Sequence, residues 1–310
     1  MQDYKRKIAV ITPVKHLNLD DLLESKGDVF YIESGSKSEV KSLIIKESID
    51  TLICNPNKQD FMIDNELLSG SKVKLINTCS TGLSHIDVDY CIENNIEIYS
   101  LTKDYDLINN LPSTSELAFG LMIDSLRNIS RSQEHVRKYG WDYTKFIGRQ
   151  IKDLKVGIIG YGRLGKLMYK YCKAFEADVS VYDPYIPGFD NVDLEDFVSD
   201  CDVISLHVHL NHETKYMIDK RTLKNVKNNL VIINTSRGAV VKEEDIIEML
   251  NNQLIGGYAT DVIEDENDNV YKSKLITEMI NNKNIIITPH VGGMTIEGQT
   301  KAYKWAINKL

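Results

Sequence analysis

Short apolar runs rich in β-branched residues alternate with helical stretches along the whole chain, and this pattern limits the possible folds most strongly. Residues 7–13 (KIAVITP) and 155–160 (KVGIIG) are typical of these runs. Strands that are apolar throughout and separated by helices belong to parallel sheets that helices cover on both faces. One set of runs ends near residue 101 and a second begins near residue 155, with a long helical region between them. The sequence therefore predicts an α/β fold with two doubly wound parallel-sheet domains.

The composition narrows the classes of function. The chain has 310 residues, which is enough for two domains of ordinary size. It carries 37 Lys and Arg against 45 Asp and Glu, so its net charge of −8 argues against a nucleic-acid partner. We see no apolar segment long enough for a signal peptide or a membrane span. We therefore expect a small-molecule substrate, and neither nucleic acid nor a membrane, as the partner.

The cysteines are scattered and odd in number, and none forms a Cys-x-x-Cys pair. This usage is typical of buried thiols in a reducing compartment. We therefore expect a cytoplasmic protein whose free cysteines are Cys54, Cys79, Cys91, Cys172 and Cys201.

A glycine-rich stretch at residues 156–166 (VGIIGYGRLGK) fits two phosphate-binding patterns. A P-loop would need Ser or Thr after Lys166 to coordinate Mg²⁺, and Leu167 stands there. The dinucleotide pattern G-x-G-x-x-G is complete, since an apolar strand leads into the glycines and a helical stretch follows. The stretch therefore predicts a dinucleotide site built on Gly160, Gly162 and Gly165.

The acid that follows the next strand predicts which dinucleotide binds. The strand DVSVY at residues 178–182 ends in Asp183, at the distance that such a site requires. A carboxylate there accepts hydrogen bonds from a ribose diol and repels a 2′-phosphate. Pro184 and Tyr185 follow, so these positions offer no arginine for that phosphate. We expect NAD rather than NADP.

The seven histidines are candidates both for metal ligands and for acid–base groups. The stretch HVHLNH holds three histidines, but no Cys or acidic partner follows at ligand spacing, so we expect no metal. Three others stand in polar or helical surroundings that favour surface or capping roles. The first group is His207, His209 and His212, and the second is His16, His85 and His135.

Charged residues follow three strands in the second half of the chain. Arg237 follows LVIINTS, the acidic run 264–269 follows GGYATDV, and His290 ends NIIITPH. Ligands of doubly wound folds bind beyond the carboxyl ends of strands. Arginine, glutamate and histidine at one such edge would supply an anion clamp and a proton-transfer pair. Taken alone, the acidic run would be a solvated loop.

These motifs together resemble one enzyme family over nearly the whole chain. VGIIGYGRLGK, YDPY, SLHV, INTSRGAVV, ATDVIEDE and TPHVGGMT match the D-isomer-specific 2-hydroxyacid dehydrogenases in order and spacing. STGLSHIDVDYC and STSELAFGLMIDSLRNI match family segments upstream, and phosphoglycerate dehydrogenases are the closest type. The resemblance implies a Rossmann NAD-binding domain at residues 102–291 and a flavodoxin-like substrate domain of residues 1–101 plus 292–310. It also implies a homodimer formed through the NAD-binding domain, with residues 140–151 (GWDYTKFIGRQI) near the interface.

The resemblance assigns roles to the catalytic residues. Arg237 matches the arginine that holds the carboxylate and carbonyl of the substrate. His290 matches the acid–base histidine, and Glu266 matches the glutamate that pairs with it. A carboxylate beside an imidazole favours the charged imidazolium and fixes the tautomer. In this interpretation His290 accepts the hydroxyl proton during oxidation and donates a proton during reduction.

The resemblance also assigns binding residues. Asp261 matches the acid that orients the nicotinamide carboxamide. Ser80, Thr81 and Gly82 match a loop whose amides bind the substrate carboxylate, and Asn110 falls where some members place a substrate-contacting asparagine. The remaining positions matched to cofactor binding are Arg163, Leu164, His207, Thr235 and Ser236.

The implied reaction is hydride transfer between NAD(H) and a D-2-hydroxy acid/2-oxo acid pair. 3-Phosphoglycerate is one candidate substrate, although Asn55, Asn57 and Lys58 stand where phosphoglycerate dehydrogenases usually carry an arginine. Two alternatives stay open. One is an NAD-sensing regulatory or scaffold protein on the same fold. The other is a phosphite- or formate-type dehydrogenase, although formate enzymes carry glutamine where Glu266 stands.

Overall fold

The chain forms two compact units. The computed structural model describes residues 5–56, 61–189, 192–264, 266, 270–282 and 284–310. Unit 1 comprises Met1–Leu111 and Gly293–Leu310, and unit 2 comprises Pro112–Gly292. Across the described residues, no helix is both long and apolar enough to cross a membrane.

Unit 1 is built on a five-stranded parallel sheet with the order β2-β1-β3-β4-β5. This is the strand order of flavodoxin-like folds, in which the chain winds first one way and then the other. The strands are β1 (Arg6–Val10), β2 (Gly27–Tyr31), β3 (Thr51–Cys54), β4 (Leu75–Thr78) and β5 (Glu97–Tyr99).

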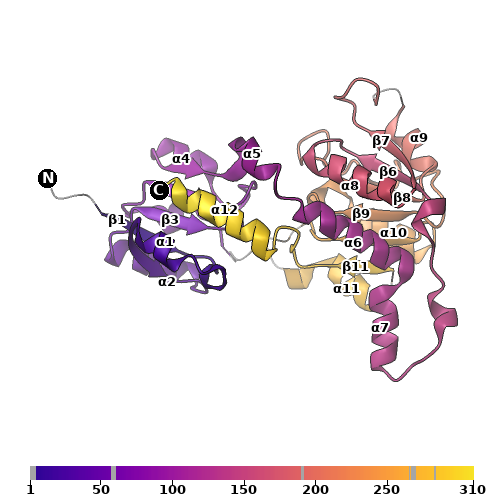
Figure 1. Ribbon diagram of the computed structural model, residues 1–310, viewed down its shortest axis with the longest axis horizontal. Coiled ribbons are helices and arrows are strands. Elements are labelled where there is room, and N and C mark those ends of the chain that lie inside the picture. Colours follow the sequence, from indigo (N-terminus) through magenta and orange to yellow (C-terminus); the bar gives the residue numbers. More distant parts are fainter. Residues whose placement is uncertain (1–4, 57–60, 190–191, 265, 267–269, 283) are drawn as a thin grey trace. The chain divides into compact units, whose positions relative to one another are not determined.

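Helices cover both faces of this sheet, as its apolar strands require (Figure 1). On one face Val40, Ile44 and Leu67 pack against the strands, and on the other Leu23 and Tyr303 do so. All five side chains are at most 1% exposed. The helices are α1 (Asp20–Glu24), α2 (Lys37–Lys46), α3 (Asn65–Leu68), α4 (Val88–Glu93), α5 (Tyr105–Ile108) and α12 (Ile296–Asn308).

The end of the chain returns to unit 1. Asn77 in β4 donates from its amide nitrogen to the carbonyl of Ala306 in α12 over 2.8 Å. Trp305 donates to Asp104 over 2.5 Å, which ties residues near α5 to the same helix. The sequence predicted boundaries at 101/102 and 291/292, whereas the compact units divide at 111/112 and 292/293. Contacts such as that of Trp305 with Asp104 keep the segment after β5 within unit 1.

Unit 2 is built on a six-stranded parallel sheet with the order β11-β10-β9-β8-β6-β7. The chain reverses its winding direction between β6 and β8, which lie side by side, and ligands of open α/β sheets bind at such a point. The strands are β6 (Lys155–Ile159), β7 (Asp178–Tyr182), β8 (Val203–Leu206), β9 (Val231–Asn234), β10 (Gly257–Thr260) and β11 (Ile285–Ile287).

Two groups of helices enclose the second sheet. Met122 of α6 and Met168 of α8 belong to the core on one face, whereas Val198, Ile246 and Leu275 belong to the core on the other. The two doubly wound parallel sheets that the sequence predicted are therefore confirmed. The helices are α6 (Ser113–Arg127), α7 (Ile129–Arg137), α8 (Arg163–Ala174), α9 (Leu194–Ser199), α10 (Glu243–Asn251) and α11 (Lys274–Asn281).

The long helical region between the two sets of strands is not one helix. It breaks at Asn128, whose φ of 54° is left-handed, and α6 ends there while α7 begins. Asparagine tolerates this conformation better than most residues. The carboxylate of Asp124 accepts a hydrogen bond of 2.8 Å from the backbone amide of Ser130. This bond holds the first turn of α7. In Figure 1 α7 leaves the sheet against which α6 packs.

Candidate active site

Each glycine of the dinucleotide pattern has its own structural reason. Gly160 has a φ of +89°, and a Cβ there would lie 2.6 Å from the carbonyl oxygen of His207. A Cβ at Gly165 would overlap the carbonyl oxygen of Gly160, so this glycine lets α8 pack closely on β6. A Cβ at Gly162 would meet nothing within 4 Å. Two glycines are thus required by the fold, and the third faces open space where a phosphate could approach.

The glycine loop leads into the first turn of α8. Gly162 is the N-cap residue and provides no side-chain cap for the helix. The positive end of the helix dipole and the amides of the first turn therefore favour an anion at this end. Ser115 of α6 donates its hydroxyl proton to the carbonyl of Leu164 over 3.0 Å, and this bond holds the turn against α6.

Asp183 lies directly after β7, where the sequence placed the ribose-binding acid. One carboxylate oxygen accepts a hydrogen bond from the amide of Tyr161 at 2.8 Å, and the other accepts from Tyr185 at 3.1 Å. Each oxygen keeps a lone pair beyond these bonds. The carboxylate is therefore oriented by two backbone amides, one of which belongs to the glycine loop.

Buried polar atoms without partners lie after β8 and β9. Neither the hydroxyl of Thr235 nor Nδ1 of His207 meets a hydrogen-bond partner within the described residues. Burial lowers the pKa of His207 to about 4, so its ring is neutral at physiological pH. Ser236 instead donates its hydroxyl to the carbonyl of Leu206 over 2.7 Å. Buried polar groups are normally paired, so the two unpaired atoms fit a site for a polar ligand.

The predicted catalytic residues of unit 2 come from three adjacent strands. The register aligns Asn234 of β9 with Thr260 of β10 and Thr260 with Ile287 of β11. Arg237 and His290 lie three residues beyond the ends of β9 and β11. The sheet therefore brings both residues to one edge, together with the acid that follows β10.

That acid, Asp261, holds the turn that carries His290. Its carboxylate accepts hydrogen bonds from the Thr288 hydroxyl at 2.5 Å and from the amides of Val291 and Gly292 at 2.8 and 2.7 Å. The amide of His290 donates to the Asp261 carbonyl over 2.9 Å, and His290 has a left-handed φ of 52°. Burial raises the pKa of the Asp261 carboxyl, and the three hydrogen bonds oppose this rise. The sequence comparison gave Asp261 only a cofactor role and missed this one.

His290 and Glu266 are in contact. Nδ1 of His290 lies 3.1 Å from each carboxylate oxygen of Glu266. The two side chains are 31% and 21% exposed, so the pair is partly shielded from water. The contact fixes the ring orientation that a proton-transferring histidine needs. Residues 265 and 267–269 of the acidic run lie outside the described residues.

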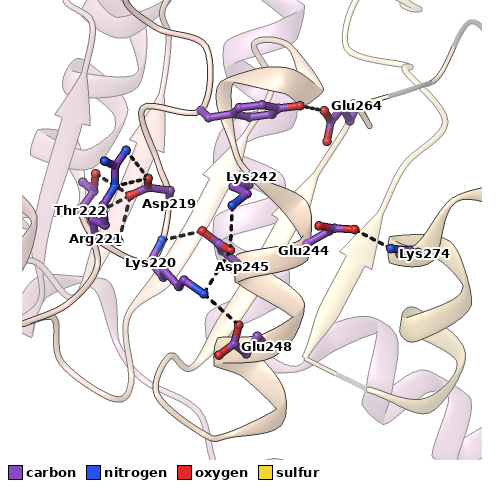
Figure 2. A network of polar contacts seen from close by, with 11 residues as sticks. Asp219, Lys220, Arg221, Thr222, Lys242, Glu244, Asp245, Glu248, Glu264 and Lys274 are labelled. Atoms are coloured by element: carbon purple, nitrogen blue, oxygen red, sulfur yellow. Dashed lines mark hydrogen bonds and ion pairs between the residues drawn. The ribbon is translucent and has the colours of Figure 1, made fainter.

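The segment before Glu266 is anchored by a polar network. The amide of Glu264 donates to the Glu243 carboxylate over 2.8 Å, and Tyr216 donates its hydroxyl to the Glu264 carboxylate. Figure 2 shows Glu264 and, separately, the pair of Glu244 at the start of α10 with Lys274 of α11. These contacts fix the path of the chain that leads to Glu266.

Arg237 has its guanidinium available for an anion. Its Nη1 donates to the backbone carbonyl of Ser236 at 2.7 Å, and its own backbone carbonyl accepts from the side-chain amide nitrogen of Asn234 at 3.0 Å. No carboxylate among the described residues pairs with it. A half-buried arginine without an acidic partner is suited to a carboxylate ligand.

In unit 1 the predicted substrate loop presents amides. The carbonyls of Ser80, Thr81 and Gly82 accept hydrogen bonds from the Leu101 amide (3.0 Å), the Thr102 hydroxyl (3.1 Å) and the Ser80 hydroxyl (2.9 Å), respectively. None of the three loop amides donates to an acceptor within the part of the chain that the structure describes. Such a loop can bind an anion through its backbone.

The fourth predicted substrate residue, Asn110, is exposed. Its amide nitrogen donates to the Asp106 carbonyl over 2.8 Å, and its carbonyl accepts from Lys301 over 3.2 Å. Asn110 therefore stands just beyond the end of α5, and these are its contacts within unit 1.

One histidine prediction is wrong. His85 is not a surface or capping residue, because it is 3% exposed and contacts Thr78 and Cys54 in the core of unit 1. The burial of His85 was not predicted because its neighbours in the sequence are polar. His209 and His212 are exposed, and the described residues contain no group of three His, Cys, Asp or Glu side chains that could hold a metal. The five cysteines are free and buried, as the sequence predicted.

Comparison with known proteins assigns the family. Residues 119–292 match the family model described as "D-isomer specific 2-hydroxyacid dehydrogenase, NAD binding domain". A D-3-phosphoglycerate dehydrogenase of Methanocaldococcus jannaschii is 29% identical over 96% of this chain and 55% of its own length. A glyoxylate reductase of Thermococcus litoralis is 32% identical over 76% of this chain and 73% of its own. The chain thus spans about half the length of that phosphoglycerate dehydrogenase.

Solved structures show the same fold. A D-lactate dehydrogenase from Aquifex aeolicus, complexed with NAD and lactic acid, superposes with a TM-score of 0.78 at 23% identity, covering 98% of this chain and 94% of that one. A pyruvate reductase of Chlamydomonas reinhardtii has a TM-score of 0.82 at 20% identity, with the same coverage of 98% and 94%. The chain belongs to the D-isomer specific 2-hydroxyacid dehydrogenase family, and its second unit contains the NAD-binding domain.

Proposed function

We propose that the protein transfers a hydride between NAD(H) and a D-2-hydroxy acid/2-oxo acid pair, with Arg237, Glu266 and His290 as its catalytic residues. The contact of 3.1 Å between Nδ1 of His290 and the Glu266 carboxylate carries this proposal. It lies at the sheet edge of an NAD-binding domain, where Arg237 also stands without a carboxylate partner among the described residues. An NAD-sensing or scaffold protein would need no such constellation.

NAD supplies the hydride acceptor when it is bound. Gly160, Gly162 and Gly165 would leave room for its pyrophosphate at the start of α8, and Asp183 would accept hydrogen bonds from its ribose. Thr235, whose buried hydroxyl is unpaired within the described residues, directly follows the carboxyl end of β9 in the same parallel sheet. The open space at Gly162 and this orphaned hydroxyl both fit such a ligand.

His290 would move the substrate proton. Because Glu266 contacts Nδ1, we assign proton exchange with the substrate oxygen to Nε2. The protonated ring would donate this proton during reduction, and the contact with Glu266 would hold the ring in orientation. Asp261 would keep the ring in place through the backbone of the turn that bears it.

We propose that the guanidinium of Arg237 in unit 2 binds the substrate carboxylate. For unit 1 we propose the role of substrate domain, because its Ser80–Gly82 loop offers backbone amides that can bind an anion. The relatives of this chain include enzymes named for phosphoglycerate and for glyoxylate, and 3-phosphoglycerate is one candidate substrate. Asn57 and Lys58, which bear on that candidate, lie outside the described residues.

A panel of 2-oxo acids tests the activity. Purified protein with NADH would be offered glyoxylate, pyruvate, hydroxypyruvate and 3-phosphohydroxypyruvate, and loss of NADH absorbance would be followed. We expect at least one compound to be reduced. In the His290→Ala variant, kcat should fall by about 10²–10⁴-fold, the range of a positioned acid–base group. Failure of every compound to consume NADH would contradict the proposed reaction.

We also propose a homodimer through unit 2. The segment of residues 139–147, here called the aromatic arm, exposes large apolar side chains. Tyr139, Trp141, Tyr143 and Ile147 are 101%, 92%, 84% and 80% exposed. Exposed apolar patches of this kind mark interaction sites. The arm is anchored just after its end, where the Arg149 amide donates to the Leu126 carbonyl over 2.9 Å.

The buried free thiols support the cytoplasm as the proposed location.

Light scattering tests the dimer. We expect wild-type protein to have twice the mass of its chain and Trp141→Glu to be a monomer at micromolar concentration. Ile92→Glu is the matched control, since Ile92 is 69% exposed on α4 of unit 1 and should leave the dimer intact. A Trp141→Glu protein that keeps the dimer mass would remove the arm from the interface.

A further inference from the structure

A buried histidine lies beneath the substrate loop of unit 1. His85 is 3% exposed, and its Nε2 lies 3.1 Å from the hydroxyl oxygen of Thr78, which is fully buried at the end of β4. The Thr78 hydroxyl lies 2.9 Å from the Ser80 hydroxyl. The Ser80 hydroxyl in turn donates to the carbonyl of Gly82 over 2.9 Å. Three consecutive hydrogen bonds therefore join the core of unit 1 to the loop.

The chain of hydrogen bonds has only one consistent direction. Each hydroxyl has a single proton to donate. Ser80 gives its proton to the Gly82 carbonyl, so its oxygen accepts the proton of Thr78. Thr78 then has no proton left for the ring, and its oxygen accepts a hydrogen bond from His85. Nε2 of His85 must therefore carry a hydrogen.

The other ring nitrogen supports the same tautomer. Nδ1 of His85 is buried and meets no hydrogen-bond partner in the described residues. An N–H group there would be a buried donor without an acceptor, which costs more than an unpaired lone pair. Burial lowers the pKa of His85 to about 4, so the ring is neutral and has a single proton to place. Cys54 Sγ, 3.5 Å from Nε2, is only a weak acceptor beside it.

The chain of hydrogen bonds ends on the last carbonyl of the loop. Gly82 has its carbonyl held by Ser80, and the neighbouring carbonyls are held by Leu101 and Thr102. With its carbonyls committed, the loop presents its amides. We propose that His85 is a positioning residue, whose Nε2–H starts the chain through Thr78 and Ser80 that shapes the Ser80–Gly82 loop for a substrate carboxylate. This inference rests on the proposed function of that loop.

Enzyme kinetics separate positioning from simple core filling. Thr78→Val removes the middle hydroxyl at nearly constant volume, and Thr51→Val is its control. Thr51 is also a fully buried threonine of the same sheet, at the opposite end of β3 from the loop. With the most active 2-oxo acid of the panel, we expect Thr78→Val to raise KM about tenfold or more, with kcat within about threefold of wild type. Thr51→Val should leave KM unchanged, and NADH affinity should be the same in both.

Variants of the histidine itself complete this test. Gln keeps a nitrogen donor near the place of Nε2, whereas Leu keeps volume without a donor. We expect His85→Gln to keep a KM within about threefold of wild type and His85→Leu to share the defect of Thr78→Val. Equal KM values in wild type and Thr78→Val would overturn the inference. So would a loss of NADH affinity parallel to the rise in KM, because that pattern indicates general damage.

A spectroscopic measurement works even if no substrate is found. Nitrogen chemical shifts of ¹⁵N-histidine-labelled protein report which ring nitrogen is protonated, and the His85→Gln spectrum identifies the signal. We expect the Nε2–H tautomer at neutral pH. An Nδ1–H tautomer would overturn the inference whatever the enzyme does. An Nε2–H tautomer in a protein that reduces no 2-oxo acid would support the hydrogen-bond chain and contradict only the proposed function.

Discussion

The two units each contain a loop that presents backbone amides, and the two loops are built in different ways. In unit 2 the loop from Gly160 to Gly165 follows β6 and takes its shape from the absence of side chains. In unit 1 the loop from Ser80 to Gly82 follows β4 and takes its shape from hydroxyl groups and a buried histidine. Both lie at carboxyl ends of parallel strands, where such folds bind ligands.

This difference in construction determines which of the two loops can be recognised from the sequence. A backbone that must approach a phosphate excludes any Cβ, so the glycine spacing is visible in the letters alone. A loop held by side-chain hydrogen bonds uses residues that are common on any surface. His85, Thr78 and Ser80 become meaningful only when their distances are known. Without a family resemblance, the second loop would not have been found.

The largest expected effect on cofactor binding comes from a single Cβ in the glycine loop. Gly165→Ala places that atom against the backbone carbonyl oxygen of Gly160, in the loop between β6 and α8. We expect NADH affinity to fall by about 100-fold or more, together with a lower thermal stability of unit 2, because the helix must move away from the strand. Calorimetric titration and thermal unfolding measure the two effects.

Gly120→Ala is the control for this change. Gly120 lies in α6 of the same unit, and a Cβ there meets nothing within 4 Å. Alanine in a helix is more stable than glycine by about 0.5–1 kcal/mol, so this variant should be at least as stable as wild type. Wild-type NADH affinity in Gly165→Ala would mean that close packing of helix and strand does not shape the cofactor site.

The sequence predicts those parts of the fold that depend on a regular pattern of apolar residues. Apolar runs without alternation predicted parallel strands, and each run contains a strand of one of the two sheets. The break at Asn128 was not predictable, because helical periodicity continues across it and one left-handed residue decides it. The unit boundary near residue 111 depends on contacts such as that of Trp305 with Asp104, between residues far apart in sequence.

A smaller effect is expected from the acid beside the glycine loop. Asp183 is oriented by the amides of Tyr161 and Tyr185, so its charge is fixed where a ribose would lie. We expect kcat/KM with NADH to exceed that with NADPH by about tenfold or more, since a 2′-phosphate would be repelled and unpaired. Asp183→Ala should narrow this ratio, mainly by weakening NADH. Steady-state rates with both cofactors measure it, and equal use of both by wild type would contradict the ribose assignment.

The sequence predicts the catalytic residues less directly than the glycine loop and more directly than the Ser80–Gly82 loop. Arg237 and His290 follow strands, so parallel-sheet topology alone predicts a shared edge. The family resemblance singled out Glu266 from an acidic run that composition would assign to a solvated loop. The role of Asp261 as the anchor of the His290 turn was missed, because it depends on backbone amides that no sequence pattern displays.

The smallest expected effect comes from removing the charge of Glu266 while keeping its hydrogen bond. Glu266→Gln keeps a hydrogen-bond acceptor beside Nδ1 of His290 and removes the charge, while Asp261 keeps its hydrogen bonds to the turn. Because the amide oxygen can still orient the ring, we expect kcat to fall by less than about tenfold in both directions. Steady-state rates of reduction and oxidation measure this effect.

Glu264→Gln distinguishes the specific pair from general acidity of the segment. Glu264 is two residues away, and its carboxylate accepts from the hydroxyl of Tyr216 (Figure 2). Both variants remove one negative charge, so long-range electrostatic effects should be similar in the two. Only Glu266→Gln removes the charge in contact with the ring. If both variants lowered kcat equally, or neither lowered it, the contact of 3.1 Å would have no part in proton transfer, and Glu266 would be only another acid of a solvated loop.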